Sequence, residues 1–289
     1  MYRKFWLENG LGQTYQLTDR NFKRFLNAPN GLGFIKDISV IQLGNREVIT
    51  GTNYQLVNPQ GELIFHGDNN DIYQGYFEYI NFIKYQPIKF HYLPANTLYD
   101  YYCEGTVAQT DKAEIGTDNV LRCPFYFKPT THWLTANANV VEIASGTSGT
   151  GKSYPMSYPY HYSGTTLSDI SLTNQGTLPT GFMLEINGET TNPQWSVSQG
   201  GLQYGIGKIN GTYDYVRINS IDGEESIYLE RNGSVIANAP SYQDLSIADG
   251  TSLITFVKLR VGESKLNLSL GNGFDGFARI QWRDQFVSV

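Results

Sequence analysis

Apolar and polar residues alternate along most of this 289-residue chain. Residues 278–283, Ala-Arg-Ile-Gln-Trp-Arg, are one example. Because successive side chains of a β-strand point to opposite faces of a sheet, this period of two predicts strands with one dry and one wet face. Only 17% of the residues are charged, and 21 Tyr and 15 Phe suit short strands that pack aromatic rings between sheets. The chain is expected to be mainly β.

One segment has a different period. Over about residues 71–85 the apolar residues recur at helical spacing, with Asp68 or Asn70 as the expected cap and Pro87 as the expected stop. A single amphipathic helix is stable only where its apolar stripe lies against other structure, so we predict an α+β unit in the N-terminal half. The stripe consists of Ile72, Tyr76, Tyr79, Ile80 and Ile83.

The length and a change in composition predict two domains. An aromatic segment ends at Leu134, and the polar stretch Thr135–Asn139 follows it, so we place the boundary near residue 136. Domain 1–136 then contains the helix. Domain 137–289 is expected to be a two-sheet β-sandwich, with hairpin turns at Asp222-Gly223, Asn232-Gly233 and Gly262-Glu263.

Cellular location and cysteine chemistry are constrained by what the sequence lacks. The N-terminal residues have no apolar run of signal-peptide length and no segment approaches a membrane span, so we expect a protein made in a cytoplasm, without a membrane partner. Cys103 and Cys123 are interpreted as buried reduced thiols. They would lie opposite one another if Tyr101–Val107 and Val120–Phe127 paired as a hairpin, but we expect no disulfide.

A short motif suggests nucleotide chemistry. Residues 146–153, Gly-Thr-Ser-Gly-Thr-Gly-Lys-Ser, match the phosphate-loop pattern letter for letter. That chemistry needs a helix to begin at Lys152 and Ser153, but Pro155 and Pro159 follow and disfavour one. We interpret Gly146, Gly151, Lys152 and Ser153 as a chance match in a Gly/Ser/Thr loop. An NTP-using enzyme, the third hypothesis for this chain, rests wholly on this motif, and no cofactor is expected.

Other sites are not favoured by the sequence. The histidines (His66, His91, His132 and His161) lack the spacing of metal ligands, so no metal is predicted. Glu224 and Glu225 follow a turn and point apart, unlike the paired carboxylates of a glycosidase. The net charge of −6, without a cluster of Lys and Arg, argues against specific nucleic-acid binding. No catalytic residues are predicted, and we expect a protein that is not an enzyme.

Several blocks rich in aromatic residues, Gly and Pro follow one another along the chain. They are Phe5–Gly10, Pro29–Gly33, Tyr79–Tyr92, Tyr102–Phe127, Tyr154–Tyr162 and Glu185–Pro193. In this order the chain resembles the distal tail proteins of long-tailed bacteriophages that infect Gram-positive bacteria. The resemblance runs nearly from end to end and rests on the order of the blocks.

This resemblance implies a structural protein of the virion. The N-terminal domain, a β-sandwich or barrel-like fold with one helix, would form a homo-hexameric ring at the tail tip, and a galectin-like C-terminal β-sandwich would project outward. The ring would join the tail tube protein to the tail-associated hub or lysin protein and to receptor-binding or upper baseplate proteins. DNA would pass through unbound, and assembly would take place in the host cytoplasm. Edge strands of the N-terminal domain could pair across subunits, and residues 277–289 could belong to either domain.

The second hypothesis, and the alternative function, is a carbohydrate-binding β-sandwich module that recognises cell-surface saccharides. Exposed aromatic rings on a β-sandwich can stack on sugar faces, and Tyr158, Tyr160 and Trp195 are the candidate contacts. The alternative, which we favour, is that Tyr154–Tyr162 packs against its own sheet.

Overall fold

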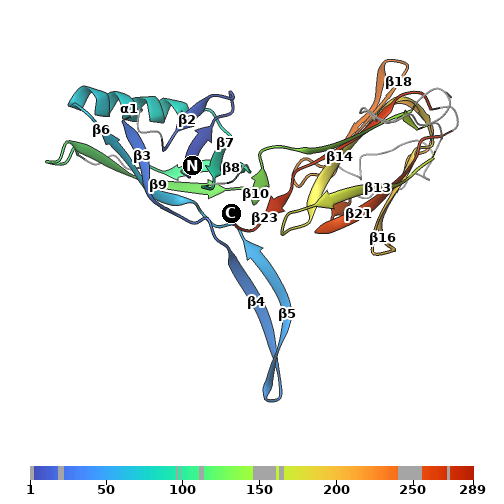
Figure 1. Cartoon of the computed structure of the whole chain (residues 1–289), viewed down its shortest axis with the longest axis horizontal. Coiled ribbons are helices and arrows are strands. Elements are labelled where there is room, and N and C mark those ends of the chain that lie inside the picture. Colours follow the sequence, from blue (N-terminus) through green and yellow to red (C-terminus); the bar gives the residue numbers. More distant parts are fainter. Residues whose placement is uncertain are drawn as a thin grey trace. The chain divides into compact units, whose positions relative to one another are not determined.

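The computed structural model describes residues 3–18, 23–95, 97, 99–110, 114–145, 161–162, 166–239, 256–271 and 274–289 (Figure 1). The chain forms two compact units. Unit 1 comprises Met1–Asn137 together with Phe286–Val289, and unit 2 comprises Ala138–Gln285. Within the described residues the fold is mainly β with a single helix, which confirms the prediction from the alternating pattern.

Unit 1 contains a nine-stranded sheet in the order β2-β1-β7-β8-β9-β6-β3, with β10 paired to β8 and β23. The backbone N–H of Leu26 on β3 donates to the carbonyl of Leu17 just after β2, at 2.7 Å, but this contact does not close the sheet into a barrel. The strands are β1 (Lys4–Glu8), β2 (Thr14–Gln16), β3 (Arg24–Asn30), β6 (Gln60–His66), β7 (Ile88–Leu93), β8 (Tyr101–Gln109), β9 (Val120–Pro129), β10 (Trp133–Thr135) and β23 (Gln285–Phe286).

The helix α1 (Asn69–Phe82) lies over this sheet, near the predicted position (Figure 1). Asp68 is its cap, because the Asp68 carboxylate accepts a hydrogen bond from the backbone N–H of Asp71 at 2.9 Å. The helix ends earlier than predicted, since the Gln86 side chain donates to the carbonyl of Ile83 at 2.8 Å and satisfies it there. The buried helical residues are Ile72, Tyr76, Tyr79 and Phe82, while Ile80 and Ile83 are partly buried.

The core of unit 1 lies between α1 and one face of the sheet and is rich in aromatic rings. Phe90 on β7 lies 5.7 Å from the ring centres of both Phe125 and Phe127 on β9. The last residues of the chain join this core: Phe286 meets Tyr101 edge to face at 5.3 Å, and Val289 is partly buried there. The segment after Gln285 therefore belongs to unit 1, whereas β22 belongs to unit 2.

A two-stranded hairpin extends from the sheet of unit 1. It consists of β4 (Ile35–Leu43) and β5 (Arg46–Gln55), which pair with each other in a separate sheet. Gly44 has a φ of +62° in the two-residue turn, a conformation that glycine adopts without strain. We call residues 35–55 the arm; Figure 1 shows it as a ribbon that leaves the body of unit 1.

Unit 2 is a sandwich of two sheets, with its core between them, as predicted. The larger sheet has the order β12-β11-β22-β14-β17-β18-β19, with β20 paired to β14; the smaller has the order β13-β21-β15-β16. The larger sheet contains β11 (Asn139–Ser145), β12 (His161–Tyr162), β14 (Thr180–Thr191), β17 (Thr212–Asn219), β18 (Ser226–Arg231), β19 (Ser234–Ala239), β20 (Lys258–Leu259) and β22 (Phe277–Trp282). The smaller sheet contains β13 (Thr166–Asn174), β15 (Gln194–Gln199), β16 (Leu202–Lys208) and β21 (Gly262–Ser269). A specific likeness to galectins remains a prediction.

Two of the three predicted hairpins of unit 2 are present. β17 pairs with β18, and β18 pairs with β19 around Asn232-Gly233, both of which have positive φ. The third prediction is wrong, because β20 pairs with β14 of the larger sheet while β21 pairs with β13 and β15 of the smaller one. The turn at Gly262 therefore carries the chain from one layer of the sandwich to the other.

The two cysteines are both buried and free. β8 and β9 do pair as a hairpin, but their register sets Gly105 opposite Pro129. Cys103 and Cys123 are therefore not opposite one another. Cys123 lies opposite Leu63 on β6, and Cys103 lies opposite Phe90 on β7. Burial raises the pKa of the Cys103 thiol. The structure agrees with two reduced structural thiols.

Candidate interaction surface

The arm presents apolar side chains on both of its faces. Directly opposed residues of an antiparallel pair point to the same face, and the register pairs Val40 with Ile49 and Ile41 with Val48. A bulge at Thr50 shifts the register by one residue between Ser39 and Val40, and the Thr50 hydroxyl donates to the carbonyl of Ser39 at 3.2 Å. One face of the outer half therefore carries Ile38, Val40 and Ile49, and the other carries Ile41, Leu43 and Val48.

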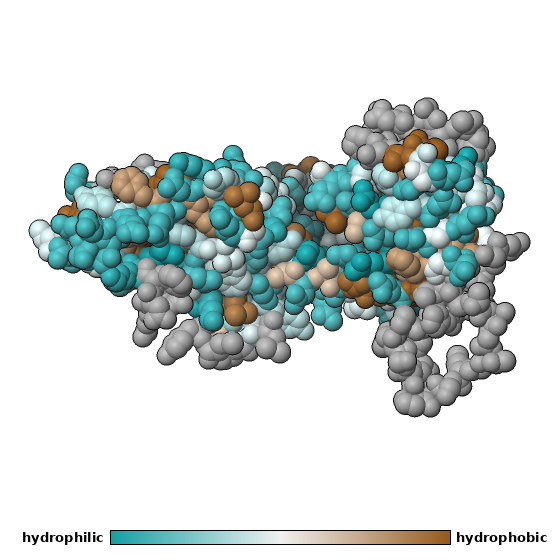
Figure 2. Space-filling view, turned by 90° about the horizontal axis from the view of Figure 1, so that it is seen from above, coloured by the Kyte–Doolittle hydropathy of each residue, from teal (hydrophilic) through white to brown (hydrophobic). Residues whose placement is uncertain are grey.

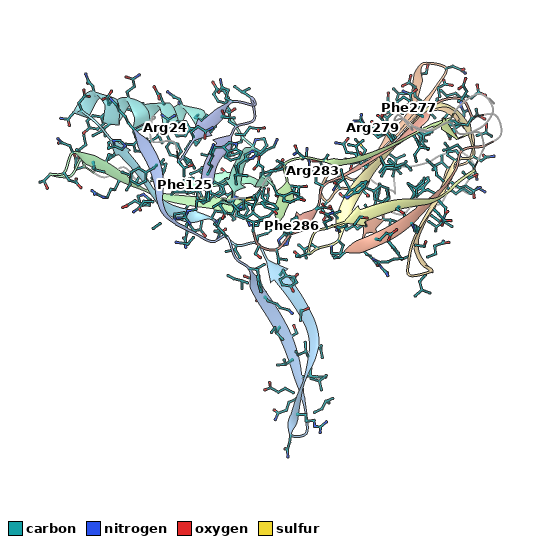
Figure 3. All side chains as sticks on the ribbon, viewed as in Figure 1. Arg24, Phe125, Phe277, Arg279, Arg283 and Phe286 are labelled. Atoms are coloured by element: carbon teal, nitrogen blue, oxygen red, sulfur yellow. The ribbon has the colours of Figure 1, made fainter. Side chains whose placement is uncertain are left out.

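These six side chains are exposed, with exposed fractions between 41% for Val48 and 61% for Ile49. Side chains project into solvent from both sides of the arm along its length (Figure 3). The charges of the arm are balanced, since Lys36 and Arg46 offset Asp37 and Glu47. Polar residues share these faces, since Gln42 is opposite Glu47 and Leu43 is opposite Arg46, and the exposed apolar side chains between them make the arm a candidate contact surface.

The face of unit 1 that carries α1 differs from the arm. Figure 2 shows this face as mostly hydrophilic, with separate small apolar patches. Phe77 on α1 is 58% exposed; of the residues three and four positions away, Gln74 and Asn81 are polar, and Tyr73 and Ile80 are partly buried. Single exposed apolar residues of this kind are normal on protein surfaces.

The edges of the unit 1 sheet are poorly suited to pairing with another chain. β2 has only three residues. β3 contains Pro29, and a bulge after Asn27 includes Ala28 at a φ of +46°. Short strands, proline and bulges are devices that protect sheet edges from association. The arm is therefore a better candidate for subunit contacts than the edge strands considered from the sequence.

The sequence-predicted sugar contacts are not assembled into a site. Trp195 lies in the core of unit 2 with 2% of its surface exposed, and its indole fills the space where a Cβ on Gly207 would be. A sugar cannot stack on this ring in the structure. Tyr158 and Tyr160 lie outside the described residues, as do Gly146, Gly151, Lys152 and Ser153 of the phosphate-loop match.

Neither a metal site nor a membrane helix is found in the described part of the chain. No group of three or more His, Cys, Asp or Glu side chains there could hold a metal ion. His91 is instead stacked between Trp6 and Tyr102, with ring centres at 4.7 and 5.4 Å, and its imidazole nitrogens lie 3.5 Å from carboxylates of Glu8 and Asp100. No helix in these ranges has the length and apolar character needed to cross a bilayer.

Sequence reasoning missed the arm, although a signal for it was present. Residues 38–49 contain two apolar runs on either side of Gly44-Asn45, which is a hairpin turn pattern. Neither run keeps strict alternation of apolar and polar residues, so neither resembles a strand with one wet face.

Comparison with known proteins gives a consistent result. Residues 4–130 match the family model described as the distal tail protein, N-terminal domain. A search of curated protein sequences found no relative. The fold is similar to a chain of the phage P2 baseplate in its activated conformation with calcium, with a TM-score of 0.61, 16% identity and full coverage of both chains.

The fold is also similar to the Dit protein (gp 19.1) of SPP1, described as a paradigm of the hub adsorption apparatus in phages that infect Gram-positive bacteria. The TM-score is 0.63 at 12% identity, and the match covers 98% of this chain and 99% of the other. Identities this low show a shared fold, while the family match identifies the N-terminal domain directly. Residues 4–130 thus match the N-terminal domain of distal tail proteins, and the chain as a whole shares the fold of phage baseplate and Dit proteins.

Proposed function

We propose that this protein is a structural component of the virion that forms a homo-hexameric ring at the tip of the phage tail. The family of its N-terminal domain and the baseplate proteins that share its fold support a role in the tail. The observation that carries ring formation is the arm, which places six aliphatic side chains in solvent on a two-stranded ribbon.

A ring requires two different patches on each subunit that meet head to tail. The arm is one such patch, and a surface of the neighbouring subunit would be the other. Because each copy supplies one arm and one receiving surface, a closed ring leaves no arm uncovered. An isolated two-stranded ribbon is only marginally stable in water, so docking would also stabilise the arm itself.

The ring would connect the tail tube protein on one side to the tail-associated hub or lysin protein on the other. Unit 1 would form the ring, and unit 2, the β-sandwich, would project outward toward receptor-binding or upper baseplate proteins. The net charge of −6 suits a channel through which DNA passes without being held. The protein would assemble in the host cytoplasm and act without catalysis.

The test is the mass of the purified protein by light scattering after size-exclusion chromatography, with negative-stain images of the same fractions. We expect a sixfold mass and particles with a central hole. A monomer that remains monomeric when tail tube protein is added would contradict the proposal. Binding of cell-wall saccharide by a monomer would instead favour the carbohydrate hypothesis.

A further inference from the structure

The sheet of unit 1 has two edges that meet without forming a ladder. β2 and β3 are the first and last strands in the order of this sheet, and no ladder pairs them among the described residues. They meet where the backbone N–H of Leu26 donates to the carbonyl of Leu17 at 2.7 Å. β6, by contrast, pairs with β9 along its whole length, from Gln60 to His66. We call residues 15–17 and 24–26 the seam.

The side chain of Arg24 crosses the seam from β3. Its Nε donates to the carbonyl of Gln16 on β2 at 3.3 Å, and its guanidinium carbon lies 3.8 Å from the centre of the Tyr15 ring. Its Nη1 lies 3.5 Å from the carboxylate of Glu78 on α1 (Figure 3). The Arg24 side chain is only 11% exposed. A side-chain donor therefore joins the two strands where a ladder does not.

The contacts of Arg24 with β2 should matter more than its ion pair with α1. A hydrogen bond from a charged donor is stronger than a neutral one, and a cation over an aromatic ring is held more strongly when both are shielded from water. The Tyr15 ring is buried, and its hydroxyl donates to the carbonyl of Gly75 on α1 at 3.2 Å, which holds the ring in place. The side chain of Glu78 is 52% exposed, and ion pairs of exposed carboxylates contribute little.

The missing ladder makes the seam a point of local opening, because segments held by few hydrogen bonds open at a lower free energy than the core. We propose that unit 1 opens first at the seam and that Arg24 is the latch that keeps it closed. Opening would break the bond between Leu26 and Leu17 and the contacts of Arg24, while the ladders of the other strands stay paired.

The latch has a consequence for association. An open seam leaves backbone groups of β2 and β3 unpaired, and strand edges of this kind can pair with another chain. By holding the two edges against each other, Arg24 protects unit 1 from association through them. This inference does not depend on the proposed ring, because it concerns the single subunit.

Native-state hydrogen exchange of the full-length protein separates opening of the seam from unfolding of unit 1. The amide of Leu26 reports on the seam. The amide of Phe127, which is buried and donates to the carbonyl of Pro59 at 2.9 Å, reports on the core. In wild type we expect Leu26 to be protected at least ~100-fold less than Phe127, with little dependence on low urea concentrations, because local opening exposes little surface. Equal protection and equal urea dependence of the two amides would overturn the inference.

Two variants test which contact of Arg24 holds the seam. Arg24→Met keeps a long side chain but removes the donors and the charge, so protection of the Leu26 amide should fall by roughly 10-fold or more. Glu78→Gln should leave that protection within about 2-fold of wild type. If Arg24→Met does not fold, Arg24→Lys replaces it, since lysine keeps the charge but lacks Nε, and a smaller fall is expected. Unchanged protection of Leu26 in the folded Arg24 variant would overturn the role of Arg24 as the latch.

Phe286→Ala is the control for a general loss of stability. Phe286 contacts Tyr101 in the core of unit 1, and this contact stays intact when only the seam opens. Protection of the Phe127 amide should therefore fall in Phe286→Ala, while that of Leu26 stays at the wild-type value. An equal fall of both amides in this variant would show that the seam opens only when the whole unit unfolds, which would contradict the inference.

Discussion

Removal of the outer arm should abolish assembly without affecting the subunit. The variant lacks residues 38–43 and 46–52, so that Gly44-Asn45 joins Asp37 directly to Asn53, which are already opposed in the register. The native turn is kept and the stem remains paired. Six aliphatic side chains are lost, all of them outside the two hydrophobic cores.

The expected magnitude follows from their exposure. Full burial of an aliphatic side chain contributes about 1.5–3 kcal/mol, and these side chains are about half exposed, so docking them could contribute roughly 5–9 kcal/mol per arm. Fixing side chains at an interface costs conformational entropy, which offsets part of this binding free energy. Even about 4 kcal/mol is a factor of roughly 1,000 in Kd.

The assay compares the light-scattering mass of wild type and variant from low to high micromolar concentration, together with urea unfolding of the monomers. We expect a monomeric variant wherever wild type is assembled, with unfolding free energies within about 0.5 kcal/mol of each other. A variant that retains the wild-type mass would refute the assignment of the arm as the assembly surface. A variant that unfolds much more readily would show that the arm supports the core of unit 1.

Three further predictions concern the two units. Gly207→Ala should destabilise unit 2 by about 1–3 kcal/mol in chemical denaturation, because the new Cβ would lie 1.9 Å from the buried indole of Trp195; unchanged stability would mean that this packing is wrong. Phe286→Ala should cost unit 1 about 1–2 kcal/mol by loss of its edge-to-face contact with Tyr101, measured as a lower unfolding temperature of the full-length protein. Burial, together with a hydrogen bond to a glutamate, raises the pKa of Tyr215 to about 12 from 10.0, so the stabilisation from its neutral phenol is complete below pH 10 and is lost as pH rises toward 12. Tyr215→Phe should therefore show a shallower fall in stability between pH 10 and 12, and an identical fall would exclude this contribution.

Local signals in the sequence predicted local structure well. The cap at Asp68 and the spacing of Ile72, Tyr76 and Tyr79 located the helix, because each of these signals acts within a few residues. Asn232-Gly233 likewise identified its hairpin, since both turn residues take the positive φ that this turn requires.

Contacts between distant segments were not predictable in the same way. The pairing of β20 with β14 rather than β21 depends on the layers of the finished sandwich. The aromatic character of Trp195 suggested a surface contact, but its burial depends on Gly207 in the facing strand. The arm was missed because none of its side chains lies in the core of unit 1. Its strands therefore lack the alternation of apolar and polar residues that indicates a strand with one buried face.

Assembly into a closed ring of six is the central proposal for this protein. Native mass spectrometry of the purified full-length protein tests it most directly, because it counts subunits without assuming a shape. The account predicts a dominant species at six times the 32.5 kDa of the chain, with no ladder of larger species, since a closed ring leaves no free arm. A dominant monomer, or an open series of masses that grows with concentration, would contradict it.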